Sequence, residues 1–289
     1  MSLDPARAGE DRVNLAEALR DLRRASGLSG ERLAGRCQMS QSKISRIETG
    51  RLLPSILDVE RILTAIEVDE ALKAELLTLA RTANAEYQDI RASVRRGLHY
   101  RQWDLAALEA ESTHMRHFLP ALITGLLQVP EYVRAGLSRA GDRAPVDTSR
   151  AVTLKLERQA ILHDESKRFE FLLTEQAARW QFCEPSIMAL QMDRLVSLSR
   201  LPAVALGILP LTTQIPEGPM HTFVAYDARL VTVELFSGQL VLRDPKDVES
   251  YRELFDFLAA HALWGAEARG FLRRLAEGFR ANGNSDAGS

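Results

Sequence analysis

The hydrophobic positions of the first eighty residues recur at helical spacing and fall into five short segments. In the first segment Leu15, Leu19 and Leu22 form a single stripe, because residues three or four apart share one face of an α-helix. After Pro54 the same spacing returns, and Asp69 is placed to cap a further helix that reaches about Ala80. Five short helices that each carry one apolar face predict a compact bundle.

Between these outer helices, two segments are joined by a tight turn. Leu33, Ala34 and Cys37 lie on one face of the earlier helix. Ser29 and Ser40 precede the two helices as N-cap residues, whose hydroxyls accept hydrogen bonds from otherwise unpaired backbone N–H groups. Two short helices around a tight turn are typical of a helix-turn-helix, which places its second helix in the major groove of DNA.

The second of these helices, predicted from about Gln41 to Thr49 and ended by Gly50, is mostly polar. Only Ile44 and Ile47 are strongly apolar, so they should anchor it to the core. The outward side chains are then Gln41, Ser42, Lys43, Ser45 and Arg46. Such side chains reach base edges and phosphates, and Arg46 is long enough for a bidentate contact to guanine. A helical bundle that never binds DNA is the alternative interpretation of this pattern.

The stretch from Leu19-Arg20-Asp21-Leu22-Arg23 to Pro54 resembles the Xre or lambda-repressor-like helix-turn-helix family of bacterial and phage regulators. The resemblance implies that the five outward residues contact DNA and that Arg23 and Glu48 form an internal salt bridge. Two positions depart from the family pattern. Gly30 replaces a glutamine that touches the DNA backbone, and Gln38 replaces a turn glycine, where a left-handed conformation costs roughly 1 kcal/mol.

Farther along the chain the hydrophobic period changes. An amphipathic helix is predicted from Trp103 to Phe118, ending before Pro120, and further helices are predicted from Pro130 and over 148–163. Short apolar runs at 169–174 and 203–209 predict strands separated by a helix over 186–199; a three-stranded meander (222–226, 230–236, 239–243) and two helices (245–260, 265–280) follow. The second half is therefore expected to be α+β, with a small mixed sheet covered by helices.

Several runs in this second half resemble the C-terminal domain of the antitoxin-like, WhiJ-type regulators of actinomycete bacteria. They are Leu108–Glu111, Leu126–Tyr132, Arg158-Gln159, Phe171–Glu175 and Leu206–Pro210. The resemblance implies a transcriptional regulator, often encoded beside a very small protein that binds and counteracts it. It brings no catalytic or cofactor-binding residue.

The expected organisation has four parts. A helix-turn-helix domain covers 11–82, a linker helix covers 83–101, an α+β regulatory and dimerisation domain covers 102–280, and a small polar tail at 281–289 is disordered.

Charge supports the DNA-binding prediction locally. Residues 20–51 carry eight basic and three acidic side chains, although the whole chain has a net charge of −2. Within this basic segment, Arg24, Arg36 and Arg51 are expected to contact phosphates, with Ser29 also at the interface. No apolar run is long enough to span a membrane and no N-terminal signal is present, so a cytoplasmic location is expected.

An enzyme is the rival class. His114 and His117 would lie one helical turn apart and could hold a metal ion, but no carboxylate or cysteine is spaced to complete that site. The chain has no glycine-rich phosphate loop and no nucleophile elbow. Cys37 and Cys183 have no metal-ligand spacing. We therefore expect no catalytic activity, no cofactor and no metal.

The sequence thus favours a homodimeric transcriptional regulator. Two recognition helices about 34 Å apart would read a near-palindromic operator on double-stranded DNA. A small protein partner encoded nearby would modulate binding through the C-terminal domain. A one-component repressor whose C-terminal domain senses a small-molecule ligand remains the alternative.

Overall fold

The computed structural model describes residues 5–89, 98–138, 148–216, 218, 220–236 and 238–286. It divides into two compact units. The first unit holds the chain up to Gln88 together with Gly238–Val248, and the second holds residues 89–237 and 249–289. The α+β class predicted from the sequence is confirmed, with a helical N-terminal region followed by strands and helices.

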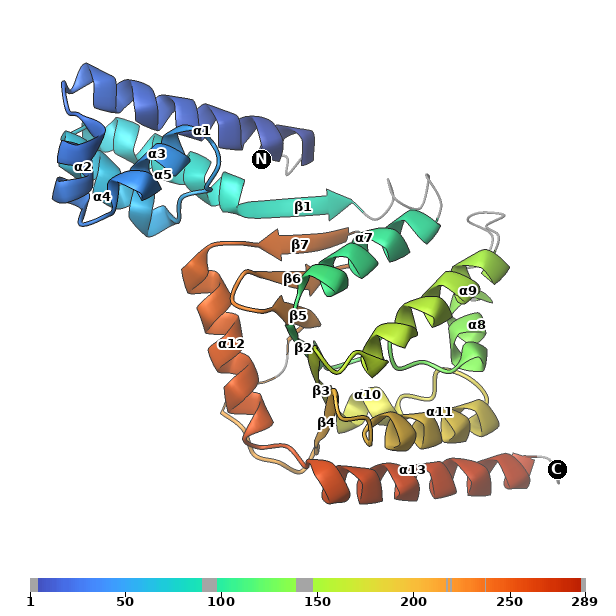
Figure 1. The fold of residues 1–289 in the computed structure, drawn as a ribbon. Helices are drawn as coiled ribbons and strands as arrows, with labels where there is room; N and C mark the ends of the chain where they lie inside the picture. Colours follow the sequence, from blue (N-terminus) through green and yellow to red (C-terminus); the bar gives the residue numbers. More distant parts are fainter. Residues whose placement is uncertain are drawn as a thin grey trace. The chain divides into compact units, whose positions relative to one another are not determined.

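The five helices predicted at the N-terminus are confirmed in the first unit (Figure 1). They are α1 (Pro5–Ala25), α2 (Gly30–Cys37), α3 (Gln41–Glu48), α4 (Ile56–Ile66) and α5 (Glu70–Asn84). Their apolar stripes meet in one core, in which Leu15, Ile47, Val59 and Leu63 are all fully buried.

Local capping signals in the sequence set where these helices begin. The side chains of Ser29, Ser40, Ser55 and Asp69 each accept a hydrogen bond from a backbone N–H in the first turn, which satisfies a donor that the helix itself cannot pair. Gln38 ends α2 in the left-handed conformation, with φ 55° and ψ 44°. The predicted strain at this non-glycine turn position is therefore present.

The linker helix expected over 83–101 is wrong at residues 85–89. Residues Ala85–Asp89 form strand β1, and residues 90–97 lie outside the described part of the chain. Strand β1 neighbours β7 (Gly238–Leu242), so backbone pairing with a distant segment replaces the helix. The predicted disordered tail is wrong over 281–286, where α13 continues, and residues 287–289 lie outside the described part of the chain.

The segment Gly238–Val248 belongs to the first unit although it lies far along the chain. Its residue Asp244, which is 2% exposed, bonds to the backbone of the bundle. One carboxylate oxygen accepts the N–H of Ile56 at 2.9 Å, in the first turn of α4, and the other accepts the N–H of Lys246 at 2.9 Å. Beside it, the N–H of Arg243 donates to the carbonyl of Asn84 at 3.1 Å. A residue far along the chain thus caps a helix of the bundle.

The second unit contains a mixed sheet with helices on its faces (Figure 1). Its strands are β2 (His114–Leu119), β3 (Arg168–Thr174), β4 (Val204–Leu209), β5 (Phe223–Tyr226) and β6 (Leu230–Glu234). Their order is β6-β5-β2-β3-β4, with β2 parallel to β3, β3 parallel to β4, and antiparallel pairs on the other side of β2. The strands predicted from the apolar runs at 169–174 and 203–209 are confirmed.

Most of the predicted helices of the second half are confirmed as well. They are α8 (Pro130–Ser138), α9 (Thr148–Arg158) with the short 3-10 helix η1 (Gln159–His163), α11 (Pro185–Leu198), α12 (Pro245–Ala259) and α13 (Gly265–Asp286). A short helix α10 (Glu175–Arg179) directly follows β3. The chain passes from the first unit to the second within α12.

The amphipathic helix expected over 103–118 is wrong in its second part. Helix α7 (Leu98–Glu111) ends early, and His114–Leu119 form β2 instead. The carboxylate of Asp227 accepts the N–H groups of Thr113 and His114 at 3.1 and 2.8 Å. Strand pairing on both sides of β2 then overrides the local helical period.

This correction removes the geometry considered for a metal site. In a strand, residues three apart point to opposite faces. His114 lies 3.4 Å from a carboxylate oxygen of Glu170, whereas His117 is buried with its ring centroid 4.6 Å from that of Phe171. Burial lowers the pKa of His117 to about 3, so its imidazole is neutral.

The carboxylate of Glu170 on β3 lies among three basic side chains on one face of the sheet. Arg116 donates to it at 3.0 Å, and His114 and Arg168 also contact it. Arg116 in turn reaches Asp256 of α12 at 3.2 Å. Burial alone would raise the pKa of Glu170, but the hydrogen bond and charge of His114, with the charges of Arg168 and Arg116, lower it to about 2.

We predict that Glu170 stabilises the fold above pH 4.5 and loses this contribution as the pH falls toward 2. Its pKa is depressed in the folded state, so the unfolded chain takes up the proton first. The full shift corresponds to at most about 3 kcal/mol. Urea unfolding at several pH values should show the stability difference between the parent and Glu170→Gln shrinking over that range. A constant difference would contradict the prediction.

We also predict that Asp244→Ala destabilises the first unit by about 1–3 kcal/mol, because the Ile56 N–H loses its acceptor. Hydrogen exchange should become faster at Ile56 and its neighbours in the first turn of α4. Glu253→Ala, an exposed change in helix α12, which directly follows Asp244, serves as the matched control and should leave this exchange unaltered. Equal exchange in the parent and both variants would refute the capping role.

Candidate nucleic-acid interface

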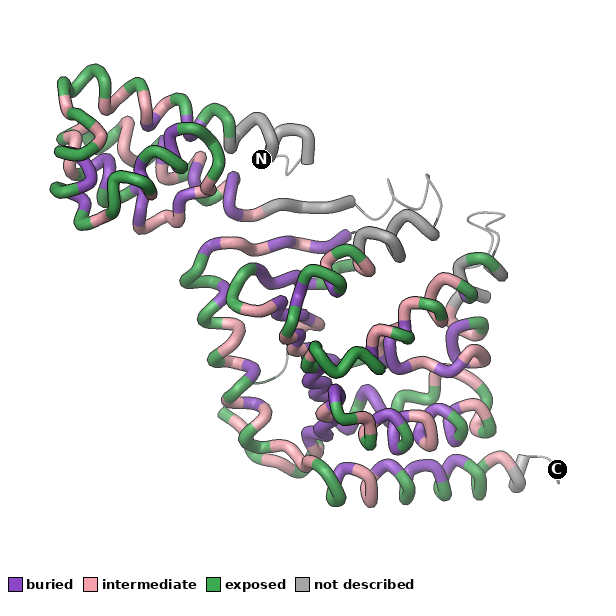
Figure 2. Tube along the Cα trace, in the orientation of Figure 1, coloured by how far each residue is buried: buried purple, intermediate pink, exposed green. Residues whose placement is uncertain are grey.

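Helix α3 presents one side to the core and the other to solvent. Ile44 and Ile47 are 1% and 0% exposed and hold the helix against the bundle, as predicted. Leu33, Ala34 and Cys37 of α2 are buried in the same cluster. The burial pattern along the chain shows this division in both helices (Figure 2).

Four of the five predicted outward residues of α3 are exposed, namely Gln41, Ser42, Ser45 and Arg46. The Ser42 hydroxyl lies 3.1 Å from that of the N-cap residue Ser40. The amide of Gln41 lies over the start of α2, since its nitrogen would be 3.9 Å from a Cβ placed on Gly30. The helix therefore carries a continuous polar surface of hydrogen-bonding groups and one guanidinium.

Behind this surface, Arg23 of α1 and Glu48 of α3 form a bidentate ion pair. The distances are 2.5 Å from Nε to Oε1 and 2.8 Å from Nη2 to Oε2. The side chains are 16% and 10% exposed, and Arg23 also donates to the carbonyl of Leu28 at 2.9 Å. The hydrogen bond with Glu48 raises the pKa of Arg23. The geometry is that of the internal salt bridge implied by the resemblance.

Lys43 is only partly exposed, because its side chain is paired within the protein. Its ammonium lies 2.7 Å from Oδ1 of Asp58, a buried residue whose other oxygen accepts the N–H of Ser55 in the capping box of α4. Reading a base would require Lys43 to leave this pair. The sequence signal for Asp58 was its place three residues after Ser55, which indicates a cap but not a partner on α3.

The predicted phosphate contacts also separate into two groups. Arg24, Arg36 and Arg51 are all exposed, but only Arg36 has partners within the protein among the contacts described. Arg36 donates to the carbonyl of Ala65 at 3.0 Å and lies 3.8 Å from Glu67. The hydroxyl of Ser29 is used as the N-cap of α2, accepting the N–H of Arg32 at 3.2 Å. Arg24 and Arg51 are therefore better placed than Arg36 to meet a phosphate.

The site offers no metal-binding chemistry within the described residues, since no three His, Cys, Asp or Glu side chains gather there or elsewhere in that part of the chain. Burial raises the pKa of the Cys37 thiol, which donates weakly to the carbonyl of Arg61 at 3.6 Å. Cys37 thus behaves as a small core residue. Across the described ranges, every helix is too short or too polar to cross a membrane.

Comparison with known proteins agrees with the geometry of the first unit. The profile of a helix-turn-helix domain matches residues 14–76, which include all of α2, α3 and α4. A search of curated proteins found no match.

Two solved structures are weakly similar. One is Nuc, a phospholipase D family member from Salmonella typhimurium, at 12% identity and TM-score 0.33, covering 57% of this chain and 90% of that one. The other is TrmBL2, described as an archaeal chromatin protein with a novel mode of DNA binding, at 12% identity and TM-score 0.32, covering 71% of this chain and 66% of that one. These scores are too low to support an argument about fold or function.

The second half of the chain has a family of its own. The profile of a domain of unknown function, DUF5753, matches residues 102–274, which is more than half of the sequence. The protein therefore belongs to the DUF5753 family and carries a helix-turn-helix domain at its N-terminus.

Proposed function

We propose that this protein is a sequence-specific DNA-binding regulator of transcription. The observation that carries the proposal is the exposed polar face of α3, supported from behind by two buried isoleucines and the Arg23–Glu48 pair. A helix held in this way can enter the major groove without losing its own packing. The activity proposed is binding, with no catalytic step.

Within this surface we assign roles by reach and exposure. Arg46 and Gln41 read base edges, with Ser42 and Ser45 beside them, because guanidinium and amide groups make bidentate contacts to guanine and adenine. Arg24 and Arg51 contact phosphates. These contacts fix the position of the protein on the DNA and do not determine which sequence it prefers. Lys43 and Arg36 contribute only if DNA displaces their partners in the protein.

The wider arrangement follows from the same proposal. Two copies associate through the second unit and bind a near-palindromic operator, with recognition helices about 34 Å apart. The resemblance to WhiJ-type, antitoxin-like regulators supports modulation by a small protein encoded nearby, and a DNA-binding role supports a cytoplasmic location. A small-molecule effector is the second candidate, favoured by a groove in the second unit that is described below.

We predict that Arg46→Ala weakens binding to the preferred site by ~1–3 kcal/mol while leaving binding to scrambled DNA almost unchanged. The reason is that base contacts contribute only on the correct sequence. The preferred site is first selected from random DNA with the purified full chain, which also reports half-site spacing and symmetry. Affinities are then measured on both DNAs at one fixed salt concentration.

Two control variants make this result interpretable. Arg51→Ala should weaken binding to both DNAs alike, as expected for a phosphate contact. Arg273→Ala removes an exposed charge from α13 in the second unit and should change neither affinity. Equal losses for Arg46→Ala on both DNAs would move Arg46 to the phosphate group, and failure of random-site selection to enrich any sequence would overturn the proposed function.

A further inference from the structure

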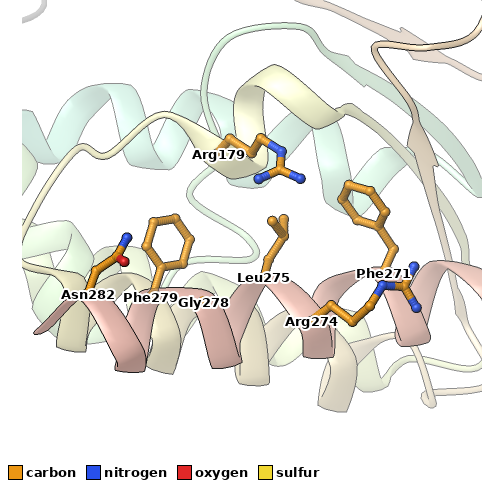
Figure 3. Close-up of a pocket in the computed structure, with 7 residues that line it drawn as sticks. All are labelled: Arg179, Phe271, Arg274, Leu275, Gly278, Phe279 and Asn282. Atoms are coloured by element: carbon orange, nitrogen blue, oxygen red, sulfur yellow. The ribbon is translucent and has the colours of Figure 1, made fainter. Parts of the chain in front are cut away.

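A groove of about 310 Å³ lies in the second unit between α10 and α13 (Figure 3). Phe271, Leu275 and Phe279 line it from α13, and Arg179 reaches over it from α10. Asn282 lies at one end. The volume is at the small end of the range for small-molecule sites. The lining is mixed, with three apolar side chains, two guanidinium groups and one amide.

The lining residues occupy one stripe of α13. Positions 271, 274, 275, 278 and 282 recur at helical spacing, so the groove follows the helix axis for about 16 Å at 1.5 Å per residue. An elongated molecule suits this shape better than a compact one. All the residues that form the groove belong to the second unit.

The charged groups of the lining have one sign. Arg179 and Arg274 both contribute guanidinium groups, and no lining residue is acidic. Arg179 pairs through Nε with Glu175, and its guanidinium carbon lies 5.8 Å from the ring centroid of Phe271. Arg274 is exposed and has no acidic partner among the described residues. An anionic group would complement this edge of the groove, because guanidinium and carboxylate form paired hydrogen bonds.

Of the glycines in α13, Gly278 lines this groove and keeps it open, and Gly270 indicates where the Arg274 side chain lies. A Cβ on Gly278 would meet nothing within 4 Å, so the space above it is empty. At Gly270 the nearest atom to such a Cβ is Nη1 of Arg274, at 3.6 Å, which places that guanidinium back along the helix. Glycine in a helix interior weakens the helix relative to alanine. At Gly278 this cost is accompanied by open space in the groove, which a ligand can occupy.

We propose that this groove binds a small apolar carboxylate, with its carboxylate between Arg179 and Arg274 and its apolar body along Leu275, Gly278 and Phe279. The shape selects an extended chain and the two arginines select the negative head. This assignment names a ligand class for the second unit and does not depend on DNA binding. Its failure and that of the proposed function can therefore be observed separately.

The test is titration calorimetry of the full chain, without DNA, using decanoate as the probe. Saturable binding of one decanoate per chain is expected. Acetate, which has the head without the chain, and decyltrimethylammonium, which has the chain with the opposite charge, should each bind at least tenfold more weakly. Equal affinity for decanoate and decyltrimethylammonium, or no saturable binding of decanoate, would overturn the proposal.

Paired variants locate the site. Gly278→Leu fills the groove and should abolish decanoate binding, while Gly35→Leu, at another helical glycine with open space around its Cβ position, should leave it unchanged. Arg274→Gln should weaken binding about tenfold, the loss expected for a charged hydrogen bond, and Arg273→Gln should stay within twofold.

The Gly278→Leu chain should melt no lower than the parent, since no atom lies in the way of the new side chain. This melting curve separates a blocked groove from a damaged fold. Decanoate affinity that is the same in Gly278→Leu and in the parent would place any binding elsewhere and refute the assignment.

Discussion

Helix α3 has only eight residues, and a helix of that length is not stable in water on its own. Its conformation therefore depends on the groups that hold it from three sides. Ile44 and Ile47 pack into the bundle, Ser40 caps the first turn, and Glu48 is fixed by Arg23. Because all of these contacts lie at the back or the ends, the outward side chains contribute little to the fold and are available for recognition.

The pair of Lys43 and Asp58 adds a further constraint on this helix. Asp58 both completes the capping box of α4 and accepts the Lys43 ammonium, so the orientation of α3 is linked to the start of α4. The same first turn of α4 receives the Asp244 carboxylate at Ile56. The capping box, the Lys43–Asp58 pair and the Asp244 hydrogen bond therefore all lie in the first turn of α4. This turn is linked by Lys43 to α3, the helix proposed to contact DNA.

Features that depend on nearby residues could be predicted from the sequence. The N-caps at Ser29 and Ser40, the two buried isoleucines of α3 and the left-handed Gln38 all follow from local hydrogen bonding and helical spacing. Features that depend on distant partners could not. The segment at His114 has a helical period, yet it pairs with strands formed by residues 168–174 and 223–226. The groove, likewise, forms only because Arg179 lies beside α13, about ninety residues later in the sequence. No local sequence pattern predicts that contact.

The contribution of Asp244 has a consequence for how this architecture is inherited. The helix-turn-helix unit is built from two stretches of chain, and the acceptor for the start of α4 comes from a stretch that follows most of the second unit in sequence. A recombination event at residue 88 would transfer the bundle without its acceptor, which would stay with the rest of the donor chain. A chimaeric regulator assembled from two relatives would keep the contact at Ile56 only if both stretches were exchanged together or if the recipient carried its own acceptor at the same place.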